Sequence, residues 1–160
     1  MVASAIPAAI DALIELCQGA TGTGGVLEGV QVIDGPPVDE PTEQLLLYIG
    51  DVPDDESPGV TGAQNWVNLG GSDADEAFTI YCTAVARSGD TDVKSERDRA
   101  FGIYDGVAQL LRIGAAGADP RLGGSVLWAR TGGEESYTPI QTDKGLLVEV
   151  GFHVVCQARI

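Results

Sequence analysis

The chain has 160 residues, 44% of them hydrophobic, and no apolar run approaches the roughly 20 residues that span a bilayer, so we expect one soluble domain over 1–160 with no membrane segment. The N-terminal stretch has no basic residue ahead of its apolar part, which argues against a signal peptide and for a protein used inside a cell. The net charge is −15, and residues 1–86 hold 14 acids and no Lys or Arg, which excludes recognition of nucleic acid through a basic patch in that half.

Hydrophobic periodicity predicts one helix and three strands before residue 70. Residues 4–17 repeat apolar side chains at helical spacing, and residues 26–33 alternate as a strand does. Residues 45–49 form a short apolar strand. Residues 64–69 alternate around Trp66, for which core packing is the default, and we expect them to pair with 45–49.

The second half of the pattern predicts a strand, a long helix and three further strands. Residues 77–88 alternate most clearly, and residues 92–113 repeat apolar side chains every three or four positions after an N-cap at Thr91 or Asp92. The last strands are predicted at 125–130, 137–142 and 146–158. Gly102 and Gly106 in the helix permit close approach of another backbone, either inside the fold or from another subunit.

This order of elements predicts the fold class. Two helices cannot cover both faces of a parallel sheet, and hairpin-type connections dominate the pattern. We therefore expect an α+β fold: a two-layer sandwich in which a mixed, mostly antiparallel sheet carries both helices on one face.

The sequence offers no recognisable catalytic, cofactor or metal site. His153 is the only histidine, and Cys156, three residues further along the same predicted strand, points to the opposite face. All three cysteines lie among apolar residues and are expected to be buried hydrophobes. The Gly-rich segment 19–25 follows a helix and lacks the Gly-Lys of a phosphate loop. We therefore expect a protein that is not an enzyme and needs no cofactor.

Acidic residues gather in two segments. The segment 50–63 contains two prolines, three glycines and four acids, so we expect a flexible loop. A second acidic turn follows at 71–76, which lacks the Gly and Glu that a calcium loop requires. The candidate contact residues in these segments are Asp51, Asp54, Asp55, Glu56, Asp73, Asp75 and Glu76.

One combination of segments resembles a known family. The strand LLLYIGD, the strand AFTIYCTAVARSGDTD leading into the helix KSERDRAFGIYDGVAQLLR, and the closing strand LLVEVGFHVVCQARI are similar to the tail terminator (tail completion) proteins of long-tailed bacteriophages. The resemblance covers nearly the whole chain and lies in architecture, not in a catalytic fingerprint.

The resemblance implies a function in virion assembly. It implies a homo-oligomeric ring, a hexamer, that caps the tail tube, ends its polymerisation and joins it to the head connector or head completion protein. DNA would pass through without specific binding, and the acids listed above would contact the lumen or a partner. The protein would be assembled in the host cytoplasm and reside in the tail or neck of the virion.

Two other classes of function stay open. The chain could be another head–tail joining or minor tail protein, or an acidic binding or inhibitor module that forms a salt-sensitive complex with a basic partner. An enzyme is the weakest reading, and a deep pocket that holds His153 beside a carboxylate would favour it.

Overall fold

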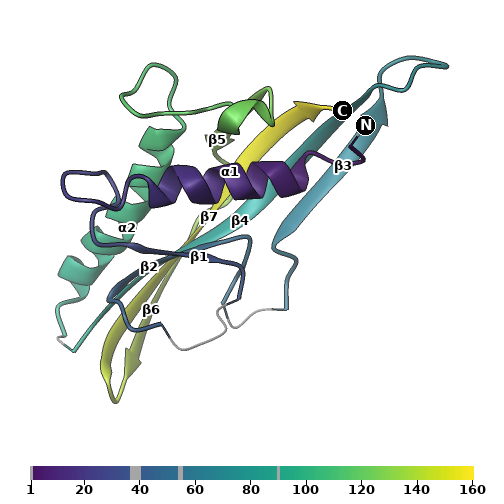
Figure 1. The fold of residues 1–160 in the computed structure, drawn as a ribbon. Coiled ribbons are helices and arrows are strands. Elements are labelled where there is room, and N and C mark those ends of the chain that lie inside the picture. Colours follow the sequence, from purple (N-terminus) through teal and green to yellow (C-terminus); the bar gives the residue numbers. More distant parts are fainter. Residues whose placement is uncertain (1, 37–40, 54–55, 90) are drawn as a thin grey trace.

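The computed structural model describes residues 2–36, 41–53, 56–89 and 91–160, and Figure 1 shows its helices and strands. The elements in chain order are α1 (Ile6–Gln18), β1 (Gln31–Asp34), β2 (Leu45–Ile49), β3 (Val60–Trp66), β4 (Ala74–Ser88), α2 (Val93–Leu110), the short 3-10 helix η1 (Leu122–Gly124), β5 (Trp128–Thr131), β6 (Ser136–Thr142) and β7 (Gly145–Arg159). The predicted order of one helix, four strands, a long helix and three strands is confirmed.

Two long antiparallel strands form the centre of the sheet. β4 and β7 pair from Asp75–Arg159 to Ser88–Leu146. The other edge of β4 is shared by β3, beside its first half, and β2, beside its second half. β6 and β5 share the other edge of β7 in the same way. Among the strands of the described residues, β1 and β2 form the one parallel pair, so the sheet is mixed and mostly antiparallel, as predicted.

Both helices pack on one face of this sheet. Alternate residues of β4 and β7 are buried on that face, from Phe78 to Ala86 and from Leu146 to Ala158. They form one core with the apolar sides of α1 and α2, including Leu13 and Val107. The predicted two-layer α+β sandwich is confirmed. The opposite face, called the open face below, carries no helix from the described part of the chain (Figure 1).

The helix α2 begins at its predicted cap and is packed through one glycine. Asp92 accepts a hydrogen bond from the backbone N–H of Ser95 at 3.2 Å. A Cβ at Gly106 would lie 2.8 Å from the carbonyl oxygen of Val26, whereas one at Gly102 would meet open space. The close backbone approach at Gly106 is therefore within this chain. Residues 26–30, predicted as strand, form the turn that makes this contact, and β1 is limited to Gln31–Asp34.

The predicted pairing of β3 with β2 is wrong. β2 has β1 on one edge and β4 on the other, so neither edge is free. β3 instead forms a hairpin with β4 and begins at Val60, which shortens the loop predicted at 50–63 to 50–59. Both ends of that loop bind one residue: the N–H of Gly50 donates to the Tyr81 carbonyl at 2.8 Å, and the N–H of Tyr81 donates to the Gly59 carbonyl at 2.9 Å.

Candidate functional site

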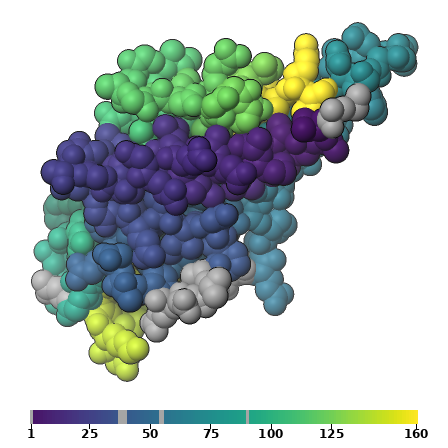
Figure 2. Space-filling model, viewed as in Figure 1, coloured from purple at the N-terminus to yellow at the C-terminus, as the bar shows by residue number. Residues whose placement is uncertain are grey.

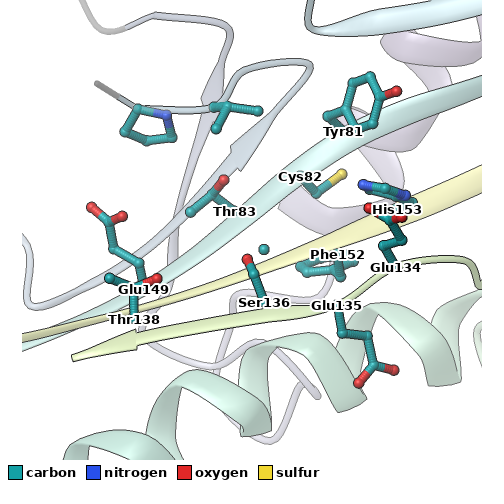
Figure 3. A pocket seen from close by; sticks show the side chains of 13 residues that line it. Tyr81, Cys82, Thr83, Glu134, Glu135, Ser136, Thr138, Glu149, Phe152 and His153 are labelled. Atoms are coloured by element: carbon teal, nitrogen blue, oxygen red, sulfur yellow. The ribbon is translucent and has the colours of Figure 1, made fainter. Parts of the chain in front are cut away.

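The open face contains a hollow between the sheet and the loop 50–59, with a volume of about 390 Å³ (Figure 3). Its lining includes three small residues that lie side by side on neighbouring strands: Thr83 of β4, Gly151 of β7 and Ser136 of β6. Val52 and Pro53 of the loop also line it. We call this space the His153 hollow, since His153 lines one end.

The polar groups of the His153 hollow come from β4, β6, β7 and the turn before β6, and Glu134 lies next to His153 in Figure 3. His153 packs edge-on against Tyr81, with ring centroids 4.5 Å apart. Glu149 lies four residues before His153 on β7, a separation of about 13 Å along a strand. Glu135 turns toward α2, where its carboxylate accepts a hydrogen bond from the Tyr104 hydroxyl at 2.9 Å. Figure 3 shows Glu135 pointing away from the imidazole.

This arrangement lacks the contacts of a nucleophilic centre. Within the described residues, no hydrogen bond joins Ser136 to His153, and the nucleophile and base of a triad need such contact. The Cys82 side chain belongs to the helix-facing core. The hollow therefore places His153 and the carboxylate of Glu134 on one lining.

The three cysteines are buried free thiols, as the sequence predicted. Burial raises the pKa of Cys17 and of Cys156 to about 12. Burial is also the main cause that raises the pKa of Cys82, and the neighbouring thiols add to it. The thiolate forms that react or bind metals are therefore scarce at neutral pH. Among the residues that the structure describes, no group of His, Cys, Asp and Glu side chains is arranged to hold a metal ion.

The predicted acidic contact residues fall into separate places. Asp51 and Glu56 line a second hollow on the open face, beside the loop 50–59. Asp73 is exposed at the start of β4, and Asp75 forms an ion pair with Arg159 at 2.8 Å. Asp54 and Asp55 lie outside the described residues. The fold brings these acids to two surfaces and does not join them in one cluster.

Glu76 is a buried structural residue, which corrects its prediction as a surface contact. Its side chain is 2% exposed. It accepts hydrogen bonds from the backbone N–H of Ala5 at 2.6 Å, the Ser4 hydroxyl at 3.1 Å and the Gln64 side-chain amide at 2.6 Å. A carboxylate at this position satisfies a free N–H group at the start of α1 and is favoured by the helix dipole. Glu76 thereby fixes α1 to β3 and β4.

The β3–β4 hairpin projects from the body of the protein. We call residues 60–75 the arm; Figures 1 and 2 show it extending beyond the rest of the fold, past the C-terminus. At its tip Trp66 is 73% exposed, Val67 is exposed and Leu69 is fully exposed. The prediction that Trp66 packs in the core is therefore wrong. The two glycines of the hairpin turn, Gly70 and Gly71, are the sequence feature that could have predicted an exposed tip.

A second apolar surface lies at the opposite end of α1. A hollow of about 550 Å³ there is lined by Leu16, Ala20, Val26, Leu110 and Ala116, together with Glu15, Gly19, Gly24, Gly25, Gln109 and Gly117. We call it the end hollow. Ile113, in the turn after α2, is 85% exposed beside it in the chain. Since α1 has 13 residues, the arm and the end hollow are separated by about 20 Å of helix.

The fold converts the uneven charge of the sequence into a spatial separation. The strands of the first half, β1 to β4, lie on one side of the sheet, and β7, β5 and β6 lie on the other. The first group carries no Lys or Arg before Arg87 at the end of β4. Arg130 and Lys144 belong to the second group and its connections. The strands on one side of the sheet therefore come from the part of the chain that has no basic residue before Arg87, and those on the other side from the part that is close to neutral.

Comparison with models of known protein families finds no match, and comparison with curated protein sequences finds none either. No helix among the described residues has the length and apolar character needed to cross a membrane.

Proposed function

We propose that the chain is a structural subunit of a phage tail, which forms a ring that caps the tail tube, ends its polymerisation and joins it to the head connector. This places the protein in the tail or neck of the virion. The observation that carries the proposal is the arm, since a monomeric protein gains nothing from holding Trp66 and Leu69 in water. A subunit that assembles has a use for such side chains as contact residues.

The separation of charge supports a ring through which DNA passes. An acidic side without Lys or Arg repels phosphate, so DNA that crosses such a surface is not held. Asp51, Glu56 and Asp73 are candidates for this surface because they belong to the part of the chain without Lys or Arg. Contact through unlike surfaces on one subunit, repeated around an axis, closes a ring.

A second candidate function is an acidic binding module for a basic partner. The hollows of the open face favour it, because Glu134, Glu149, Asp51 and Glu56 line them. Such a module would act as a monomer and form a complex that weakens steeply as salt is added.

Two measurements test the proposed function. Tail tubes assembled from the tube protein encoded with this chain are expected to stop at a uniform length, each with a ring at one end in negative-stain images, when this protein is added. Tubes whose length distribution is unchanged by the protein would contradict the proposal. A salt-sensitive one-to-one complex with a basic protein, in the absence of any ring, would favour the binding module.

A further inference from the structure

We propose that copies of this chain associate head to tail, with the arm of one copy seated in the end hollow of the next. This inference rests on the proposed ring and assigns the two surfaces that build it. The arm supplies Trp66 and Leu69, and the receiving surface is the end hollow together with Ile113, which lies between the lining residues Leu110 and Ala116 in the chain.

The apolar surfaces match in character and in size. Trp66 and Leu69 project from a narrow hairpin; the Trp66 side chain is 73% exposed and Leu69 is fully exposed. The end hollow has about 550 Å³ and apolar side chains from α1, α2 and the turns beside them. A space of this size suits an aromatic anchor, the kind of side chain that carries most of the energy of protein interfaces.

Arginines in the segment beside the end hollow complement the acid near the tip of the arm. Asp73 is exposed beside the tip, and the arm has no basic residue, whereas Asp75 is already paired with Arg159. The segment 109–121, which forms part of the end hollow, carries Arg112 and Arg121 against one acid, Asp119. Asp119 is engaged locally, because its carboxylate accepts hydrogen bonds from the N–H groups of Arg121 and Gly123.

A second copy is the occupant that these charges select. Residues 1–86 carry 14 acids and no Lys or Arg, so two copies repel each other where these parts of the chain approach. Placing the arm on the segment 109–121 brings acids against arginines and avoids contact between the acidic parts of the two copies. Glu15 is the charged residue in the lining of the end hollow, and Arg112 follows the lining residue Leu110 by two positions in the chain.

The positions of the surfaces favour a closed ring over a symmetric dimer. The arm begins at the N-terminal end of α1, where Gln64 binds the Ala3 carbonyl and Glu76 binds Ala5. The end hollow includes Glu15 and Gly19 at the C-terminal end of the same helix. Two different surfaces at opposite ends make a heterologous contact, which propagates around an axis.

Paired variants test the contact. In an arm variant Trp66 and Leu69 become Ser, and in a hollow variant Ile113→Ser is combined with Ala116→Glu, which fills the end hollow and adds an acid. Val93→Ser is the matched control, since Val93 is an exposed apolar residue at the other end of α2. Circular dichroism and thermal unfolding check that all variants are folded, because these side chains are largely in solvent.

Light scattering and sedimentation measure the oligomeric state of each variant and the strength of its self-association. The wild type and the control are expected to form a ring, and each variant to weaken self-association by at least about 30-fold, the effect of truncating an interface anchor. An equimolar mixture of the two variants is expected to form dimers and nothing larger, because it retains one intact arm and one intact end hollow per pair. A mixture that stays monomeric, a ring of undiminished strength in either variant, or a wild type that is monomeric at every concentration overturns the inference.

The outcome separates this inference from the proposed function. If the arm variant still forms rings and still limits tube length, the contact assigned here is wrong and the tail function stands. If the ring depends on the arm but tubes grow without limit, the contact stands and the tail function is wrong.

Discussion

Replacing Glu76 with Ala is expected to destabilise the fold by about 3 kcal/mol. The change removes the acceptor for three donors, from Ser4, Ala5 and Gln64, at 2.6 to 3.1 Å. A hydrogen bond to a charged group contributes about 1.5–3 kcal/mol, and the three are not additive because the buried carboxylate also pays a desolvation cost. The amide of Glu76→Gln keeps the volume but has one acceptor oxygen, so about half of this loss is expected.

Urea unfolding monitored by circular dichroism measures the effect as a lower transition midpoint at an unchanged m-value. For a domain of this size a loss of about 3 kcal/mol lowers Tm by roughly 6–12 °C. Asp73→Ala is the matched control, since Asp73 is an exposed acid on the same segment and such changes stay within about 0.5 kcal/mol. Equal stability of Glu76→Ala and Asp73→Ala would refute the role of Glu76 in fixing α1.

Three further outcomes are expected. Gly106→Ala should destabilise the fold by about 1–3 kcal/mol, because its Cβ would meet the Val26 carbonyl oxygen at 2.8 Å. Gly102→Ala, with open space around it, should stabilise the fold by up to about 1 kcal/mol. Denaturant unfolding measures both changes, and equal effects would contradict the packing at Gly106. The three buried thiols should resist a disulfide reagent at pH 8 in the native protein and react fully after unfolding, and fast native labelling would contradict their burial. Burial, and then the hydrogen bond to Glu135, raise the pKa of Tyr104, so the stability it contributes is complete below the usual tyrosine pKa of about 10 and is lost as pH rises through the folded-state pKa; ultraviolet titration should show earlier ionisation in Glu135→Gln, and an unchanged curve would contradict the contact.

The sequence predicts the layers of this fold because the alternation in its two long strands is nearly unbroken. Every second residue from Leu146 to Ala158 is buried, and the same rule holds for Phe78 to Ala86 in β4. A period of two fixes which residues face the helices without knowledge of the neighbouring strand. The strand limits shifted by a few residues, as in β4, which begins at Ala74.

The pairing of strands and the exposure of the arm could not be predicted in this way. The predicted strand 64–69 alternates as a core strand does, but β3 ends at Trp66 and residues 67–69 belong to the bend and turn of the hairpin. Nothing in the segment indicates that its partner is β4. The partner of β3 depends on β1 occupying the other edge of β2, and that pairing is formed between segments distant from β3 in the chain. Glu76 likewise looked like one more acid in a charged turn, and its burial follows from the position of α1.

The attachment of the loop 50–59 to a single residue has a practical consequence. Because both ends bind Tyr81, the distance that the loop must close is fixed by β4 and does not depend on how many residues lie between Gly50 and Gly59. Lengthening a closed loop costs little, about 0.6 kcal/mol for each doubling. Peptide tags or fluorescent labels inserted there should leave the sheet intact.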